Sequence, residues 1–260
     1  MPEVSKMKKP DVKVVLLGDM NVGKTSLLHR YTERRFKDTV STVGGAFFMK
    51  QWGPYNISIW DTAGREQFHG LGSMYCRGAA AVILTYDVTN WQSLAELEER
   101  FLSLTDTANH DCIYALVGNK ADLTDPKAQL CLDSGVASEE CDEERTEPQV
   151  LPGCPTPPAS PTSLSGINLH KQVSPEDAAA LYGRILRYKG LEEKSSLPAE
   201  KLCFETSAKT GYNVDALFEA LFDLVLPSIL RKRNENQESP TVDLEQCRGV
   251  GYKRARAACC

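Results

Sequence analysis

The feature that most constrains the fold is a strand, loop and helix pattern in residues 11–31. Residues 11–17 form a mostly apolar run that is typical of a buried strand in a parallel sheet. Residues 18–25 satisfy the pattern G-x-x-x-x-G-K-[ST], and a helical pattern begins at Thr25. In this context the loop N–H groups cradle phosphates, Lys24 reaches the β and γ phosphates, and Thr25 offers a hydroxyl to Mg²⁺. The segment therefore predicts a site for a nucleotide triphosphate.

A second motif follows a later apolar strand, where Asp61 is followed by Thr62, Ala63 and Gly64. An acidic residue at a strand end suits a metal ion, and a glycine three positions later brings a backbone N–H close to a phosphate. Such a D-x-x-G turn is common in α/β proteins, so its meaning depends on the phosphate loop upstream.

Residues 119–122, Asn-Lys-Ala-Asp, follow the apolar run 112–118 and indicate which base is bound. Guanine carries an N1–H and a 2-amino group side by side, and the carboxylate of Asp122 can accept from both, whereas adenine has no such donor pair. Asn119 would contact N7 and tie loops together, and the Lys120 stem would cover one face of the ring. The alternative is a solvated turn that binds no base, and the phosphate loop upstream argues against it.

A third element, residues 205–209, follows the strand-like residues 201–204. The backbone N–H of Ala208 could hold the guanine O6 atom. Alone this element is weak evidence for a guanine site. It gains support because it follows the other two motifs in the expected order.

These motifs, with Thr42-Val43-Gly44 between them, resemble the Ras superfamily of small GTPases in order and spacing. Residues 60–64, 75–79 and 86–89 look like the Rab branch, which controls vesicle traffic. The resemblance covers about residues 10–123 and 171–230. It implies a P-loop α/β fold with a six-stranded, mostly parallel sheet and helices on both faces, and it implies GTP or GDP with Mg²⁺ as ligands.

The resemblance also assigns roles to single residues. Phe36 would stack edge-on against the base, although capping the first helix against the sheet is an equally simple role. Thr42 would bind Mg²⁺ and contact the γ-phosphate, Asp61 would hold a metal-bound water, and the Gly64 N–H would sense the γ-phosphate. Loss of that phosphate would release both loops. Phe47, Trp60 and Tyr75 resemble the aromatic surface that partners read, with plain packing as the alternative for Trp60.

The candidate site residues fall into four groups. The nucleotide group is Gly18, Asn21, Val22, Gly23, Lys24, Thr25, Ser26, Phe36, Thr42, Gly64, Asn119, Lys120, Asp122, Ser207, Ala208 and Lys209; the metal group is Thr25, Thr42 and Asp61; the catalytic group is Lys24, Thr42, Gly64 and Arg65; and the lipidation group is Cys259 and Cys260.

Two residues depart from the family pattern. Arg65 follows the D-x-x-G glycine, at the position where family members that hydrolyse GTP carry a Gln. The amide of that Gln orients the attacking water. A guanidinium has only donors and cannot accept a hydrogen bond from the water. Met20 stands in the phosphate loop where a small residue is usual, so its side chain would crowd the γ-phosphate. Slow intrinsic GTP hydrolysis is expected. The opposing hypotheses are that Arg65 supplies positive charge in cis, or that a partner contributes the missing group.

Composition is consistent with a cytosolic protein that has one α/β core and appendages. The chain has 260 residues, of which 42% are hydrophobic. Its nine cysteines lack C-x-x-C spacing and fit reduced thiols better than disulfides or a zinc site. The basic N-terminal residues are not a signal peptide, and no run reaches the ~18 apolar residues of a membrane span.

The sequence predicts four segments. Residues 1–10 are an extension, and residues 11–123 and 171–230 form the GTPase domain. Residues 124–170 form an acidic, Pro/Ser-rich insertion with eight acidic and two basic residues, and we expect it to be disordered. It could be modified at Thr156, Ser160 or its cysteines, or it could be a tolerated loop. A flexible tail, 231–260, is expected after a final amphipathic helix.

The chain ends Ala-Ala-Cys-Cys, which lacks the C-a-a-X arrangement and looks like the doubly geranylgeranylated end of Rab proteins. Two lipid chains give a stable anchor where one gives marginal binding. Arg248, Lys253, Arg254 and Arg256 could add attraction to an anionic leaflet, whereas a nucleic-acid role is improbable for so short a patch.

The resemblance also implies the partners and the cellular location of the protein. An exchange factor, a GTPase-activating protein, switch-reading effectors, an escort protein and a GDP-dissociation inhibitor are expected, with the chain itself a monomer. The location would be the cytoplasmic face of Golgi, endosomal or phagosomal membranes, with an extracted cytosolic pool. Two other hypotheses stay open: a GTP-locked docking module without useful hydrolysis, and a P-loop ATPase or nucleoside kinase, which leaves residues 119–122 and the cysteine tail unexplained.

Overall fold

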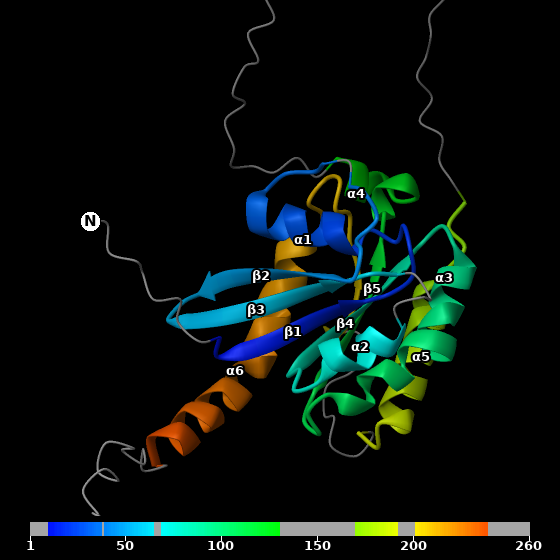
Figure 1. The fold of residues 1–260 in the computed structure, drawn as a ribbon. Coiled ribbons are helices and arrows are strands. Elements are labelled where there is room, and N and C mark those ends of the chain that lie inside the picture. Colours follow the sequence, from blue (N-terminus) through cyan, green and yellow to red (C-terminus); the bar gives the residue numbers. More distant parts are fainter. Residues whose placement is uncertain (1–9, 38, 65–68, 131–169, 192–200, 239–260) are drawn as a thin grey trace, which may run out of the picture.

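The computed structural model describes residues 10–37, 39–64, 69–130, 170–191 and 201–238. These residues form one six-stranded sheet in the order β2-β3-β1-β4-β5-β6, in which only β2 runs antiparallel to its neighbour. The predicted six-stranded, mostly parallel α/β fold is confirmed. Helices α1 and α6 lie on one side of the sheet, and α2, α3 and α5 lie on the other (Figure 1).

The strands have the following bounds: β1 Val12–Leu17, β2 Gly45–Trp52, β3 Tyr55–Thr62, β4 Ala81–Asp87, β5 Ile113–Asn119 and β6 Cys203–Glu205. Every residue of β4 is buried, as expected for a central strand that is covered on both faces. The edge strand β2 instead alternates between exposed and half-buried residues. The Gly53-Pro54 turn joins β2 to β3.

The α-helices are α1 Lys24–Glu33, α2 His69–Cys76, α3 Trp91–Glu96, α4 Pro126–Gln129, α5 Pro175–Tyr188 and α6 Val214–Glu238. A π-helical turn, Leu97–Phe101, and a 3₁₀ turn, Ser103–Thr107, continue α3, and a second 3₁₀ turn covers Ala121–Leu123. Within the described residues, no helix combines the length and apolar character needed to cross a membrane.

Helix α5 begins as its sequence predicts. Ser174 is the N-cap, Pro175 occupies the first turn, and Ser174 and Asp177 form a reciprocal capping box. Its buried residues are Ala178, Leu181, Tyr182 and Ile185, which recur at helical spacing and face the core.

Helix α6 packs an aromatic face against α1 and the β2–β3 hairpin. Phe218 stacks on Tyr31 with ring centroids 3.9 Å apart, and Phe222 meets Trp52 edge-on at 5.7 Å. The Trp52 indole N–H also donates to Glu219 at 2.9 Å. On this helix Leu217, Phe218, Leu221, Phe222 and Val225 are fully buried, whereas Leu224 is half-buried.

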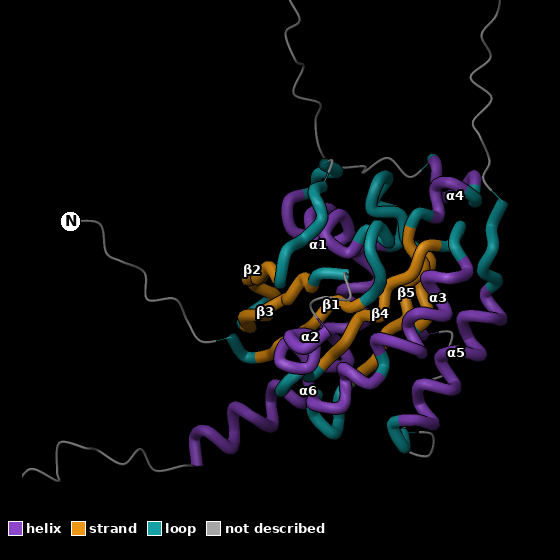
Figure 2. Tube along the Cα trace, turned by 45° about the vertical axis from the view of Figure 1, so that its right-hand side comes forward, coloured by secondary structure: helices purple, strands orange, loops and turns teal. Residues whose placement is uncertain are grey.

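Two predicted boundaries are wrong. Helix α6 does not end near Leu230 but continues to Glu238, so residues 231–238 are helical rather than a flexible tail. This end of the helix projects beyond the sheet (Figures 1 and 2) and is held by Arg233, which donates to Asp11 at 2.8 Å and to the Pro54 carbonyl at 3.2 Å. Residues 231–238 have no apolar face, so hydrogen bonds rather than hydrophobic packing hold this end of the helix.

The predicted insertion also begins later than expected. Residues 124–130 are ordered because Asp125 accepts from the Lys127 N–H as N-cap and Pro126 starts α4. The buried Ala128 packs in the fold, and its carbonyl accepts from Thr210 at 2.6 Å. Residues 131–169, which hold most of the predicted insertion, lie outside the described residues, as do the N-terminal residues 1–9 and the tail residues 239–260 with the predicted lipidation sites Cys259 and Cys260.

Candidate guanine nucleotide and magnesium site

The candidate site lies where the carboxyl ends of the parallel strands meet. The register places Leu16 beside Asp61, Asp87 beside Asn119 and Gly118 beside Glu205. Parallel strands deliver their following loops to one edge of the sheet, which is where ligands bind in open α/β folds. The sequence motifs therefore converge although they are far apart in the chain.

Two glycines allow the phosphate loop to pack tightly. Gly18 has φ 144°, and a Cβ there would lie 2.1 Å from the Thr85 carbonyl oxygen. Gly23 has φ 93°, and a Cβ there would lie 2.3 Å from Asn119 Nδ2. Any larger residue would push the loop away from β4 and from the guanine loop, so both positions need glycine.

Lys24 lies inside the phosphate loop. Its Nζ donates to the carbonyl oxygens of Gly18 and Asp19, each at 2.8 Å, and the residue is only 6% exposed. Burial lowers its pKa to about 8, against the opposing effect of the Asp61 and Asp19 charges. A buried ammonium beside the N-terminus of α1, whose first turn carries no acidic residue, favours an anionic ligand.

The three predicted metal ligands lie together. Thr25 Oγ1 donates to Asp61 Oδ2 at 2.7 Å, Thr42 Oγ1 donates to the same oxygen at 3.0 Å, and the two hydroxyls are 2.9 Å apart. Asp61 is fully buried, and its Oδ1 has no hydrogen-bond partner in the described part of the chain. A buried carboxylate oxygen with spare acceptor capacity fits a cation or its bound water.

This donor set suits Mg²⁺ among the common ions. The protein offers only one carboxylate and two hydroxyls here. Mg²⁺ usually takes few protein ligands, because it keeps several waters and binds substrate phosphates. The described residues contain no cluster of three or more His, Cys, Asp or Glu side chains that would suit a dedicated metal cage.

Gly64 lies against the phosphate loop. A Cβ there would lie 2.4 Å from the Met20 nitrogen and 2.5 Å from the Asp19 carbonyl carbon. This closeness places the second motif beside the loop and leaves no room for a side chain at position 64. Arg65, the predicted catalytic departure, falls outside the described residues.

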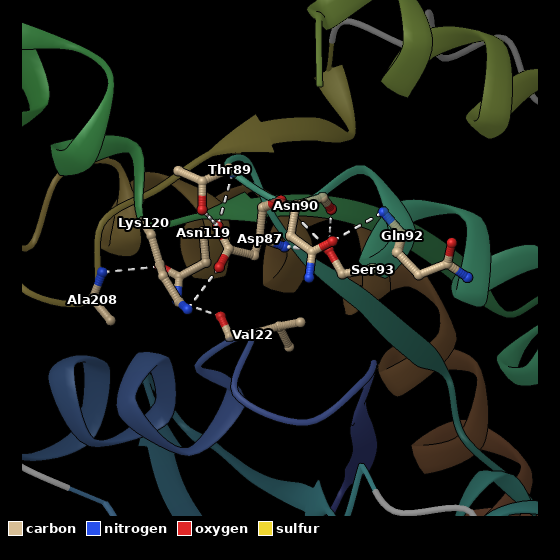
Figure 3. A network of polar contacts seen from close by, with 9 residues as sticks. All are labelled: Val22, Asp87, Thr89, Asn90, Gln92, Ser93, Asn119, Lys120 and Ala208. Carbon is tan, nitrogen blue, oxygen red and sulfur yellow. Dashed lines mark hydrogen bonds and ion pairs between the residues drawn. The ribbon is translucent and has the colours of Figure 1, made fainter. Parts of the chain in front are cut away.

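Asn119 ties the guanine motif to the other two loops, as the sequence predicted. Its Nδ2 donates to the Val22 carbonyl at 2.9 Å, and its Oδ1 accepts from the Ala208 N–H at 3.0 Å (Figure 3). The Ala208 N–H, which the sequence assigned to guanine O6, is therefore directed at Asn119 in this structure. The predicted contact of Asn119 with guanine N7 stays a prediction.

Asp122 is 8% exposed and accepts a 2.6 Å hydrogen bond from Ser207 Oγ on Oδ1. The contact fixes the carboxylate and explains why Ser207 belongs to the site. Lys120 has a left-handed backbone, φ 68°, and its Nζ lies 2.7 Å from Asp87 Oδ2. Figure 3 shows the Lys120 side chain pointing toward Asp87. The ion pair holds the lysine stem at the rim of the site.

A cavity of about 310 Å³ joins these groups. Its lining contains most of the predicted nucleotide residues, namely Asn21, Gly23, Lys24, Thr25, Ser26, Phe36, Thr42, Gly64, Asn119, Lys120, Asp122, Ala208 and Lys209. The predicted residues Gly18, Val22 and Ser207 are not in the lining and act from behind it, through the contacts given above. Phe36 is 46% exposed and Met20 is 42% exposed, so both stand at the open side.

Several lining or supporting residues were not predicted. Thr39, Val40 and Ser41 line the cavity and directly precede Thr42 in sequence, a proximity that could have revealed them. Asp87 ends the strand next to β5, so strand adjacency could have placed it beside Lys120. Arg30 donates to the carbonyls of Ala208 and Lys209, and no local signal indicated this contact.

The fold and this site define the class, and the chain belongs to the Ras family, whose family pattern matches residues 13–226. It is a small GTPase of the Rab branch. The chain is 61% identical over 254 residues to the Ras-related protein Rab-20 of Homo sapiens, covering 98% of this chain and all of that protein. It is 60% identical to Rab-20 of Mus musculus, over 98% of this chain and all of that protein. The Ras-related protein Rab5 of Nicotiana tabacum is 42% identical over 50% of this chain and 68% of its own length.

Proposed function

We propose that this protein is a membrane-anchored switch of vesicle traffic that binds GDP and GTP with Mg²⁺. The observation that carries the proposal is the cavity with two chemically distinct ends. Asp122 lines one end, and Lys24, Thr25 and Thr42 line the other, where the two hydroxyls contact Asp61. A purine with adjacent donors suits the first end, and phosphates with a small cation suit the second.

The proposed roles follow from these positions. Lys24 and the α1 N-terminus bind the phosphates, Thr25 and Thr42 with Asp61 hold Mg²⁺ and its waters, and Asp122 selects guanine. When bound, Mg²⁺ supplies charge neutralisation at the β and γ phosphates. Because Thr42 and Gly64 come from two different segments, loss of the γ-phosphate would release both segments and alter the surface that partners read.

The nucleotide proposal is tested on the full chain by titration with fluorescent GDP, with ADP as the competitor that lacks the donor pair. We expect GDP to compete at least about 100-fold better than ADP, because two hydrogen bonds to a carboxylate are lost with adenine. Equal competition would contradict guanine selection and favour an ATPase or nucleoside kinase.

For the reaction, we propose slow intrinsic GTP hydrolysis because of Arg65 and Met20. A single-turnover assay on wild type and Arg65→Gln measures this directly, and Met20→Ser tests the crowding separately. Faster cleavage by Arg65→Gln supports the slow switch, and faster cleavage by Met20→Ser measures how much the crowding contributes. Equal or faster cleavage by wild type than by Arg65→Gln contradicts it, and favours charge supplied by Arg65 in cis.

The second candidate function is the GTP-locked docking module, which the same two residues favour. The nucleotide that copurifies with the protein separates the two candidates. A locked module carries mostly GTP, whereas a slow but working switch carries mostly GDP after hours at room temperature.

For the membrane, we propose that Cys259 and Cys260 are both prenylated and hold the protein on the cytoplasmic face of Golgi, endosomal or phagosomal membranes, with a cytosolic pool. The family sets the expected partners, which are an exchange factor, a GTPase-activating protein, effectors, an escort protein and a GDP-dissociation inhibitor. Mass spectrometry of the protein from eukaryotic cells measures the lipids. The Cys259→Ser and Cys260→Ser variants, alone and together, should lose membrane fractionation stepwise.

A further inference from the structure

Arg30 of α1 makes direct contacts with a segment 178 residues away in the chain. Its Nε donates to the Ala208 carbonyl at 2.8 Å, and its Nη2 donates to the Lys209 carbonyl. Both acceptors belong to the third nucleotide motif, which lines the cavity. Arg30 itself lies outside the lining, about 1.7 turns beyond Lys24 on α1.

These contacts close a ring of hydrogen bonds around the base end of the cavity. The Val22 carbonyl of the phosphate loop accepts from Asn119, and Asn119 accepts from the Ala208 N–H. The carbonyl of the same Ala208 accepts from Arg30, and α1 leads back to the phosphate loop at Gly23. Ala208 is therefore held on both of its polar backbone groups, one by the guanine loop and one by α1.

An arginine is suited to this task for a geometric reason. A guanidinium presents five N–H donors in a rigid fork, so it can donate to two successive carbonyls at once. A third hydrogen bond, from Arg30 Nη1 to the Arg34 carbonyl at 3.1 Å, fixes the fork on α1. A lysine would offer one flexible ammonium. The segment is held as well by its own turns, by Ser207, which donates to Asp122, and by Thr210, which donates to the Ala128 carbonyl of α4.

The neighbouring Arg34 offers a matched comparison. It lies on the same helix end and makes contacts of 2.6 Å with both carboxylate oxygens of Asp215 at the start of α6. It joins α1 to α6, whereas Arg30 joins α1 to Ala208 and Lys209.

We propose that Arg30 is a positioning residue that sets how long a guanine nucleotide stays bound, because it holds the Ala208-Lys209 segment in place over the base. The inference rests on the proposed guanine nucleotide binding. Arg30 does not touch the ligand, so its loss should act on nucleotide release more than on association, which depends on the phosphate end.

The experiment uses the full chain loaded with fluorescent GDP in Mg²⁺ and follows its release into excess GDP. Arg30→Ala should release nucleotide about tenfold faster, Arg30→Lys should also be faster than wild type, and Arg34→Ala should stay within about twofold of wild type. The association rate should change little. If Arg30→Ala does not give folded protein, Arg30→Lys carries the same comparison.

A second readout separates positioning from general destabilisation. Hydrogen exchange of the GDP-bound protein should show lost protection in residues 206–212 of Arg30→Ala, with unchanged protection in β4. Release from Arg30→Ala at the wild-type rate, or equally fast release from Arg34→Ala, would overturn the inference. A wild type that binds no GDP would instead contradict the proposed function.

Discussion

Ser207 donates a 2.6 Å hydrogen bond to Asp122, so a carboxylate that lines the cavity is fixed by a residue from a loop 85 positions away. The contact uses Oδ1 and holds the plane of the carboxylate at the end of the cavity. The proposed base selection thus depends on two segments that only the folded sheet brings together.

This relationship predicts the effect of Asp122→Asn. An amide cannot accept from both guanine donors, so GDP affinity should fall by about 100-fold or more. Xanthine has a carbonyl where guanine has its 2-amino group, and the new amide can donate to it. Affinity for xanthosine diphosphate should therefore rise, as measured by competition against fluorescent GDP.

Asp125→Asn is the matched control for that substitution. Asp125 is the N-cap of α4 and asparagine caps equally well, so GDP affinity should remain at the wild-type value. Loss of GDP binding in this control would show that the effect at Asp122 is a loss of local charge or structure and not of base recognition.

The Thr25, Thr42 and Asp61 cluster predicts how nucleotide release responds to removal of Mg²⁺. A chelator should speed GDP release from wild type by at least about tenfold, because the metal is shared by protein and phosphates. Thr25→Ala should release quickly even with Mg²⁺ present and respond little to the chelator. Thr32→Ala on the same helix, which loses only a hydroxyl bond to the Leu28 carbonyl, should behave as wild type.

The sequence was sufficient for much of the site because the motifs end parallel strands. The apolar runs in the β1 and β5 sequences identified them as interior strands, which their burial confirms, and parallel strands bring their carboxyl ends to one edge. The meeting of Asp61 with Thr25 and of Asn119 with Val22 follows from that geometry.

The parts that escaped prediction depend on contacts between distant segments. Arg30 looks like any exposed helical arginine until residues 208 and 209 fold against it. Residues 231–238 carry no apolar face, and their helix is held by the Arg233 contacts with Asp11 and Pro54. The α4 helix, by contrast, had a readable signal in Asp125-Pro126, an N-cap followed by a first-turn proline.

Phe218 should be among the most costly residues to truncate. It is fully buried, stacks on Tyr31 and lies near Phe222, so Phe218→Ala should lower the free energy of unfolding by about 3–5 kcal/mol. Urea unfolding of the GDP-bound protein measures the change. Leu230→Ala, on the same helix at a 46% exposed position, should cost less than about 1 kcal/mol, and similar losses for both would contradict the packing argument.

Cys76 and Cys112 predict a specific loss of stability at alkaline pH. Both thiols are buried, and burial raises the pKa of each from 9.0 to about 12. Above pH 9 the unfolded chain releases these protons while the folded chain keeps them, so the free energy of the unfolded state falls relative to the folded state and stability decreases as pH rises. The two thiols together should account for roughly 2 kcal/mol between pH 9 and 10.

The loss due to these thiols is isolated by comparing wild type with the Cys76→Ala/Cys112→Ala double variant in urea unfolding at both pH values. The lowered pKa of Lys24, about 8, and the raised pKa of Tyr86 also make stability depend on pH, but they are present in both proteins and cancel in the comparison. The variant starts less stable because two buried side chains are truncated, yet it should lose less stability on the step from pH 9 to 10. Parallel losses in the two proteins would mean that the thiols ionise as readily in the folded chain as in the unfolded one.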